Sequence, residues 1–370
     1  MNRIEQNFFA LLRLGLGAGL LQDASEICLS PDAWEMLYEL ASKLSVVGIA
    51  YAGICKLPKS SQPPIDLAFQ WASEAETIRG HNRMVNAEAA RLTELFAKQG
   101  RRTAILKGSA NARLYPDKFM RQCGDIDIWI DGGKDCVLSL LQRLNLMTRS
   151  DFSKHHVHLE NTRNGVIVEA HFMASSGNFN PFTSQRMMRY LDREIEHAES
   201  VPEGFRVPSL KFALTMQLSH IQRHFITGGI GLKQIVDYFI LLQKSSEEDR
   251  AEVASHLKRF GLWHAAAALM WLLEHVLNLT KDRMLCAPDG RRGKKMLAAV
   301  LAGGNFGFYS KVESRSLVPR WFGRRFRVLR LFYFEPVEVF WHQLRYAKWF
   351  ALSIPVRIRL RRLSLEGLSV

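Results

Sequence analysis

The chain has 370 residues, 47% of them hydrophobic, which makes it long enough for two or three domains and too apolar for a disordered protein. Its 50 Lys and Arg residues outnumber 36 Asp and Glu residues, and the formal charge of +14 suits polyanionic partners such as nucleotides, nucleic acid or an anionic membrane face. The five cysteines form no CxxC pair, which argues against a structural zinc site and favours a reducing, cytoplasmic location.

Residues 1–100 are expected to be helical throughout. The apolar stretch from Phe8 to Leu21 is shorter than the roughly 18–20 residues of a membrane-spanning helix and lacks a signal-peptide cleavage pattern, so we predict a packed helix there. The apolar spacing from Trp34 to Ala50 predicts one helix with a buried face. The proline-rich segment from Lys56 to Pro64 predicts a linker, and a long helix is expected from Ile65 to Lys98.

The segment from Ala104 to Asp131, AILKGSANARLYPDKFMRQCGDIDIWID, predicts a strand, a tight Gly-Ser turn, a short helix, a loop and a second strand. The second strand opens on Asp125 and Asp127, which flank Ile126. Because side chains alternate along a strand, both carboxylates point to one face and the isoleucines mark the other face as buried. Two like charges beside a core favour a bound divalent cation, and Mg²⁺ takes carboxylate oxygens as ligands.

A β-hairpin is expected next, from two alternating runs, HVHLE at 156–160 and VIVEAHF at 166–172. They are separated by a segment that ends in Asn164-Gly165, the strongest short hairpin signal. If these two residues form the turn, two cross-strand pairs follow: Glu160 with Glu169 and His158 with His171. The polar side chains then share one face of the hairpin and the apolar side chains share the other.

Histidines are further candidate ligands. The hairpin region is rich in imidazole, which fits either transition-metal binding or solvated strand residues near a phosphate site: His155, His156, His158 and His171. His220 and His224 lie four residues apart in the later helical region 201–310, so they share one helix face. They are either metal ligands or histidines that face a charged neighbour or a cleft.

Four features coincide here: a Gly-Ser pair, the aspartate pair, a third carboxylate and nearby cationic residues. Gly108 and Ser109 stand between a strand and a helix, where backbone N–H groups and the helix dipole favour a phosphate. Three carboxylates could hold the one or two Mg²⁺ ions that in-line phosphoryl transfer needs: Asp125, Asp127 and Glu169. Two cations are close to them in the sequence: Lys107 and Arg121.

The motifs LKGSA, GDIDIWI and VEAHF resemble the uncharacterised nucleotidyltransferase family of the DNA polymerase beta-like nucleotidyltransferase superfamily, and flanking helices carry the resemblance from residue 5 to residue 280. The resemblance implies a catalytic and metal-binding set of Asp125, Asp127 and Glu169, in which Glu169 helps to deprotonate the acceptor. It also implies a nucleotide-binding set: Lys107, Gly108, Ser109, Arg121, His171, Lys233 and Asp237.

We therefore expect an α+β fold, a nucleotidyltransferase-like mixed β-sheet core of four or five strands flanked by mostly helical N- and C-terminal lobes. The expected divisions follow the changes of sequence pattern: an N-terminal helical region at 1–100, an α/β core at 101–200, a C-terminal helical lobe at 201–310 and a basic, aromatic-rich tail at 311–370.

The expected activity is Mg²⁺-dependent transfer of a nucleoside monophosphate from an NTP to an acceptor hydroxyl or phosphate, with Mn²⁺ as an alternative metal. The acceptor is left open among a small molecule, RNA and protein. The rival interpretation is a non-catalytic nucleotide- or polyanion-binding protein.

The tail at 311–370 contains 13 Lys and Arg residues against four Glu residues, with aromatic side chains throughout. Three interpretations fit this composition: an interfacial helix on anionic lipid at the inner membrane face, a nucleic-acid surface with stacking aromatics, or a solvated basic face over a satellite core.

Overall fold

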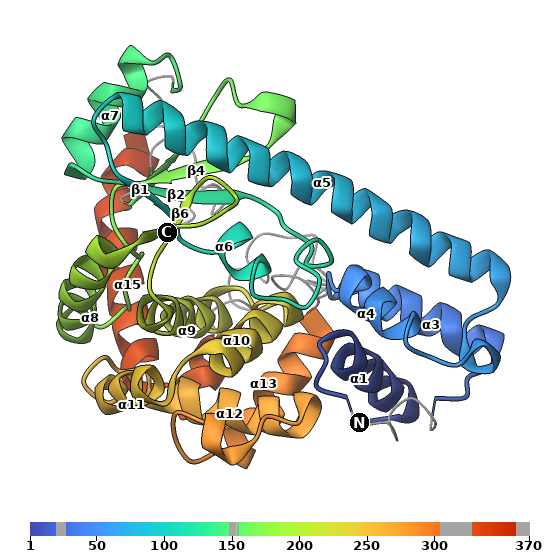
Figure 1. Cartoon of the computed structure of the whole chain (residues 1–370). Helices are drawn as coiled ribbons and strands as arrows, with labels where there is room; N and C mark the ends of the chain where they lie inside the picture. The colour runs from blue at the N-terminus through green and yellow to red at the C-terminus, as the bar shows by residue number, and fades with distance from the viewer. Residues whose placement is uncertain (20–26, 148–152, 154, 304–327, 360–370) are drawn as a thin grey trace.

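The computed structural model describes residues 1–19, 27–147, 153, 155–303 and 328–359. A small mixed β-sheet lies between helices from both ends of the chain (Figure 1). One long helix, α5 (Ile65–Lys98), crosses over the sheet and continues to the N-terminal helices, and most of the C-terminal helices lie on the opposite side of the sheet in this view. The expected α+β class, a mixed sheet between mostly helical regions, is confirmed.

The N-terminal helices are α1 (Arg3–Gly15), α3 (Pro31–Lys43) and α4 (Val47–Ile54). The single helix predicted from Trp34 to Ala50 is wrong, because the chain breaks between α3 and α4, where Ser45 adopts a left-handed φ of 57°. Leu44 and Val46 on either side of Ser45 are fully buried, so the break turns both apolar side chains into the core. No glycine or proline marks this break in the sequence. Of the helix predicted at 8–21, residues 20 and 21 lie outside the described part of the chain.

Helices α1 and α4 touch through their backbones at two reciprocal glycines. A Cβ atom on Gly53 would lie 2.1 Å from the Leu11 carbonyl oxygen, and one on Gly15 would lie 2.1 Å from the Ile49 carbonyl oxygen. No real carbon approaches an oxygen so closely, so each position excludes any side chain. Two glycines therefore set how closely these helices pack.

We predict that Gly53→Ala lowers the free energy of unfolding by about 1–3 kcal/mol, because the added methyl group forces the two helices apart. Gly80→Ala is the matched control, since Gly80 lies inside α5 and a Cβ atom added there would have no neighbour within 4 Å. There alanine adds helix propensity and raises stability by up to about 1 kcal/mol. Urea denaturation of both variants measures the difference, and equal midpoints would contradict the packing argument.

Helix α5 connects the two main hydrophobic cores. In its first half, Trp71 and Ile78 belong to the core formed by the N- and C-terminal helices. In its second half, Val85, Leu92 and Phe96 belong to the core at the sheet. The first four of these positions recur every seven residues, so they form one apolar stripe along the helix. The 34 residues span about 50 Å, and one rigid element thus links the N-terminal helices to the sheet.

The sheet has the strand order β1-β2-β4-β3, with β2 parallel to β4 and both outer strands antiparallel to their neighbours. Its strands are β1 (Thr103–Ile105), β2 (Ile126–Ile130), β3 (His156–His158) and β4 (Val168–His171). One face packs in the same core as α5 and α7 (Gly133–Arg143) through buried aliphatic side chains: Ile126, Ile128, Ile130, Val168 and Ala170. The alternate positions place Asp127, Glu169 and His171 on the other face, together with Trp129, which packs against the core of the helices.

The predicted hairpin register is wrong by two residues. His158 pairs with Glu169 and His156 pairs with His171, because the connection is longer than a two-residue turn. It includes a 3₁₀ turn at Arg163–Gly165, where the Arg163 N–H donates to the Glu88 side chain of α5 at 3.2 Å. Because the shift is an even number of residues, the polar and apolar faces stay as predicted.

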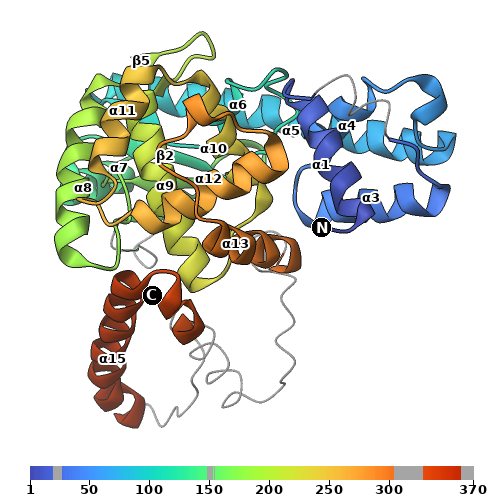
Figure 2. The same cartoon turned by 90° about the horizontal axis from the view of Figure 1, so that it is seen from below.

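The described part of the C-terminal region consists of helices and turns apart from a two-stranded sheet of β5 (Glu199–Ser200) and β6 (Arg206–Val207). Its helices are α8 (Pro181–Glu194), α9 (Leu210–Thr227), α10 (Leu232–Lys244), α11 (Glu247–His256), α12 (Trp263–Leu277), α13 (Gly290–Gly303) and α15 (Pro336–Arg359). The latter part of α15 projects away from the body of the molecule (Figure 2). Among the described residues, no helix combines the length and apolarity needed to cross a membrane.

Candidate functional site

The polar face of the sheet borders a cavity of about 350 Å³ whose opposite wall is α9. A smaller cavity beside it reaches Gly108, Lys233 and α10. Asp125 and Asp127 line both cavities. The two aspartates singled out in the sequence therefore lie where the two spaces meet.

The strand register brings two of the three predicted carboxylates together. Asp127 of β2 is the direct partner of Glu169 on the parallel strand β4. Asp127 is 1% exposed, and Glu169 is half-buried. Their oxygens and a His171 ring nitrogen all lie within 4.8 Å of one another, a spacing that fits a metal ion. Asp125 precedes β2 by one residue and lines the same cavities, but it belongs to neither group of three potential ligands found among the described residues.

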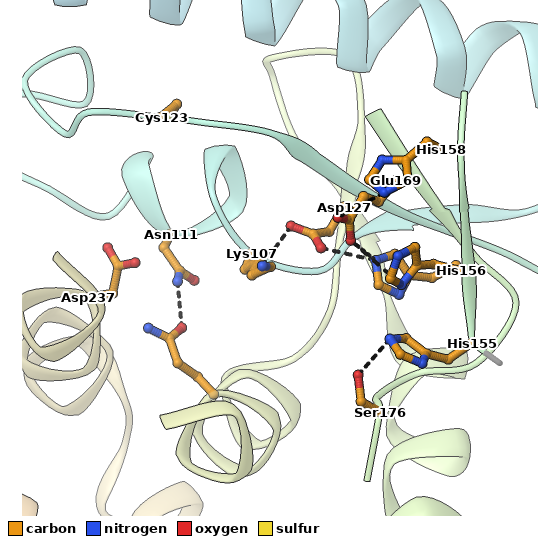
Figure 3. Close-up of polar contacts among 12 residues, drawn as sticks. Lys107, Asn111, Cys123, Asp127, His155, His156, His158, Glu169, Ser176 and Asp237 are labelled. Atoms are coloured by element: carbon orange, nitrogen blue, oxygen red, sulfur yellow. Dashed lines mark hydrogen bonds and ion pairs between the residues drawn. The ribbon is translucent and has the colours of Figure 1, made fainter. Parts of the chain in front are cut away.

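Two basic side chains face the buried Asp127 carboxylate. Lys107 Nζ lies 3.2 Å from Asp127 Oδ2 (Figure 3). His171 Nε2 lies 3.0 Å from Asp127 Oδ1. Burial would raise the pKa of Asp127, but Lys107 and His171 outweigh burial and hold that pKa below its ordinary value. Burial likewise opposes the charged form of His171, yet its hydrogen bonds to Asp127 and Glu169 raise its pKa. The site therefore favours the negatively charged form of Asp127 and the positively charged form of His171.

The residues present fit a divalent cation. Asp125, Asp127 and Glu169 offer the hard carboxylate oxygens that Mg²⁺ and Mn²⁺ prefer. Asp127 Oδ2 is buried and accepts no hydrogen bond from any described residue, although Lys107 lies close to it. A buried carboxylate oxygen with only an ion-pair neighbour is a natural ligand atom, since an incoming cation would compensate its lost hydration.

The predicted phosphate turn lies against the aspartate segment. Gly108 has a φ of 65° and ψ of −107°, and a Cβ atom there would lie 3.3 Å from the Asp125 carbonyl oxygen. This conformation and this close contact favour glycine. Ser109 begins the short helix α6 (Ser109–Ala112), and its buried hydroxyl has no hydrogen-bond partner among the described residues. The turn therefore places a buried hydroxyl without a partner beside the carboxylates.

Two residues predicted to bind nucleotide, Arg121 and Asp237, form an ion pair with each other and line the smaller cavity. Arg121 donates two hydrogen bonds of 2.7 Å to Asp237, and the Tyr115 hydroxyl donates a third of 2.7 Å. Arg121 and Asp237 are almost fully buried, and burial disfavours the charged form of each. The opposite charge of the partner outweighs burial, so the pKa of Arg121 is raised and the pKa of Asp237 is lowered. Because Arg121 precedes β2 and Asp237 belongs to α10, the pair fastens the C-terminal helices to the sheet.

Lys233 lies one turn before Asp237 on α10 and lines the smaller cavity. Burial and the nearby Arg121 charge lower its pKa to about 8, so it is mostly protonated at neutral pH. Lys233 and Asp237, the two predicted helical-lobe residues, both line the smaller cavity, and Lys233 supplies a positive charge there.

We predict that Asp237→Ala lowers the free energy of unfolding by about 3–5 kcal/mol, because it leaves the Arg121 guanidinium buried without its partner. Replacing both partners, as Arg121→Met with Asp237→Leu, should recover much of that loss. Glu94→Ala is the control, since it breaks the exposed Lys98–Glu94 pair on α5 and should change nothing measurable. Thermal or urea denaturation measures both variants. Equal stability of Asp237→Ala and Glu94→Ala would contradict a stabilising role for the Arg121–Asp237 pair.

Sequence reasoning missed part of the cavity wall. Arg223 of α9 lies between the two helical histidines, lines the larger cavity and stacks on Phe179 at 4.9 Å. His220 and His224 line the same wall, and burial is the main reason that both of their pKa values are lowered, that of His224 to about 4. The signal was present in SHIQRHF, whose helical spacing places these side chains on neighbouring faces.

A Gly-Ser turn after β1, an acidic pair at β2 and a third acid on the neighbouring parallel strand define a nucleotidyltransferase-type α+β core. The chain belongs to a family of uncharacterised nucleotidyltransferases, whose family model matches residues 30–278. The matched region runs from α3 through α12 and includes the whole site. A search of curated proteins finds no match to this chain.

Proposed function

We propose that this protein transfers a nucleoside monophosphate from an NTP to an acceptor hydroxyl or phosphate, with Mg²⁺ or Mn²⁺ as its metal. The observation that carries the proposal is the placement of Asp127 beside Glu169 across β2 and β4, with Asp125 on the same wall, where two cavities meet. A transferase needs its two substrates on either side of the reacting phosphorus, and the carboxylates lie between two spaces. The family described as nucleotidyltransferases supports the reaction class.

In the proposed reaction, the acceptor oxygen attacks the α-phosphorus, the bond to the β-phosphate breaks, and pyrophosphate leaves. Glu169, half-buried and beside Asp127, accepts the acceptor proton. A metal ion held by Asp125, Asp127 and Glu169 would offset the charge of the triphosphate and of the developing transition state. Lys107, His171 and Lys233 contribute positive charge around the same space and position the phosphates.

We predict that Asp125→Ala and Asp127→Ala each abolish NTP turnover, because each removes a metal-binding oxygen from the junction of the cavities. The loss should exceed about a hundredfold in pyrophosphate release, as expected when the charge stabilisation of a transferring phosphoryl group is removed. Asp131→Asn is the matched control, since Asp131 follows the opposite end of β2 and pairs with Arg102. Chelation of the metal by EDTA should abolish turnover of the wild-type protein as well.

Circular dichroism and thermal melting establish that the variants remain folded. Wild-type-like turnover in a folded Asp125→Ala or Asp127→Ala variant would refute the assignment. Calorimetry with Mg²⁺ and each NTP, run beside the pyrophosphate assay, distinguishes the non-catalytic alternative, in which binding occurs without pyrophosphate release. Radiolabelled NTPs offered with sugar phosphates, tRNA or protein then identify the acceptor class.

We also propose that α15 attaches the protein to an anionic membrane surface. Exposed apolar side chains recur at three-, four- and eight-residue intervals and so share one helix face: Val337, Phe340, Leu344 and Leu352. Exposed Lys348 lies among them, and its long side chain can reach an anionic headgroup while its aliphatic stem stays with the apolar face. The other parts of the predicted basic tail, residues 311–327 and 360–370, lie outside the described residues.

We predict that the full-length chain floats with vesicles that contain phosphatidylglycerol but not with neutral phosphatidylcholine vesicles. Phe340→Asp should weaken this binding about tenfold or more, since a fully buried Phe side chain contributes about 1.5–3 kcal/mol. Phe69→Asp on α5 replaces another exposed phenylalanine, outside α15, and serves as the control. Equal flotation of both variants, or no flotation of the wild-type chain, would remove the membrane proposal.

A further inference from the structure

A second group of potential metal ligands lies at the outer edge of the hairpin. We propose that His156, His158 and Glu169 bind a transition-metal ion of the zinc class, at a site distinct from the Asp127 cluster that shares only Glu169 with it. The ligand atoms of these three residues all lie within 4.8 Å of one another. The proposed Mg²⁺-dependent transfer does not use His156 or His158.

The strand register builds this group. His156 and His158 are two residues apart on β3, so their side chains leave the same face of the strand. His158 is the direct cross-strand partner of Glu169 on β4. As a result, His156 Nδ1 lies 3.7 Å from Glu169 Oε2 and His158 Nε2 lies 4.0 Å from Glu169 Oε1 (Figure 3).

The donor types select the metal. Two imidazoles and one carboxylate form a three-ligand set typical of zinc, with the fourth position open to water, whereas Mg²⁺ prefers oxygen ligands alone. Bonds of about 2.0–2.1 Å in tetrahedral geometry separate neighbouring ligand atoms by about 3.3 Å. The observed separations of 3.7 and 4.0 Å therefore need to shorten by less than one ångström, which small side-chain rotations provide.

An unpartnered atom supports the proposal independently. His156 Nδ1 is buried and has no hydrogen-bond partner among the described residues, and its 3.7 Å separation from Glu169 is too long for a hydrogen bond. A buried ring nitrogen without a partner is unfavourable, and a metal ion in front of it would remove that penalty. The His158 side chain is 57% exposed, so an ion can enter from solvent.

Occupation of this outer site has a consequence for Glu169. Glu169 Oε2 also lies 3.4 Å from His171 Nε2, so the same carboxylate faces both the outer histidines and the inner Asp127 cluster. Zinc bound by His156 and His158 draws Glu169 outward and withdraws it from the inner cluster. Zinc at the outer site therefore inhibits nucleotidyl transfer, an effect that rests on the proposed function.

The test measures Zn²⁺ binding to metal-free, full-length protein by competition with a chromogenic chelator, which requires no turnover. His158→Ala should weaken binding by more than about 100-fold, beyond the roughly 10–100-fold loss typical of an outer-shell partner. His197→Ala removes an exposed histidine elsewhere and should leave binding unchanged. His171 is a potential ligand of the inner cluster only, so His171→Gln removes no ligand of the outer site and should retain outer-site binding.

Wild-type Zn²⁺ affinity in His158→Ala would overturn the proposal. An equal loss of Zn²⁺ affinity in His171→Gln and His158→Ala would also overturn it, because that result would place the ion in the inner cluster. Because His158 is exposed, its replacement leaves the core intact. In a second arm, Zn²⁺ should inhibit Mg²⁺-dependent pyrophosphate release in the wild-type protein and inhibit the His158→Ala variant much less. A protein without transferase activity that still shows His158-dependent zinc binding would refute the proposed function and leave the zinc site standing.

Discussion

The buried charge of Asp127 is the constraint on which the site depends. A carboxylate that is 1% exposed is strongly unfavourable unless opposite charge or hydrogen-bond donors surround it. Here Lys107, just after β1, supplies the charge, and His171 on β4 supplies a ring nitrogen at 3.0 Å. The carboxylate lies in the interior because β2 is a central strand, four of whose five residues are buried. The sheet therefore forces negative charge into the interior, and the surrounding residues are arranged to compensate it.

Helices lie on both faces of the sheet and hold these residues in position. Helix α5 covers the apolar face of the sheet and ties it to the N-terminal helices, while α9 faces the polar side across the cavity. The ion pair of Arg121 with Asp237 holds α10 against the segment that leads into β2. Arg121 and Asp237 also line the smaller cavity, so the pair forms part of the wall that it holds in position.

Much of the site could be predicted from the sequence because its signals are local. Alternation along a strand placed Asp125 and Asp127 on one face, and a Gly-Ser pair after a strand indicated the turn beside them. The hairpin faces were also correct, although the register was displaced by two residues, because alternation repeats every two residues and tolerates an even shift. The length of the connection escaped prediction because Glu88, 75 residues away, binds the Arg163 backbone.

The sequence by itself determined the α+β class, the long helix α5, the apolar and polar faces of the strands and the identity of the acidic residues, since these follow from spacing within a short segment. Only the tertiary structure decided which charges meet. It paired Arg121 with Asp237 across 116 positions of the chain, added Arg223 to the cavity wall and placed Glu169 between two groups of potential ligands. Pairing of distant charges depends on the packing of whole helices against the sheet, and no local pattern in the sequence encodes that packing.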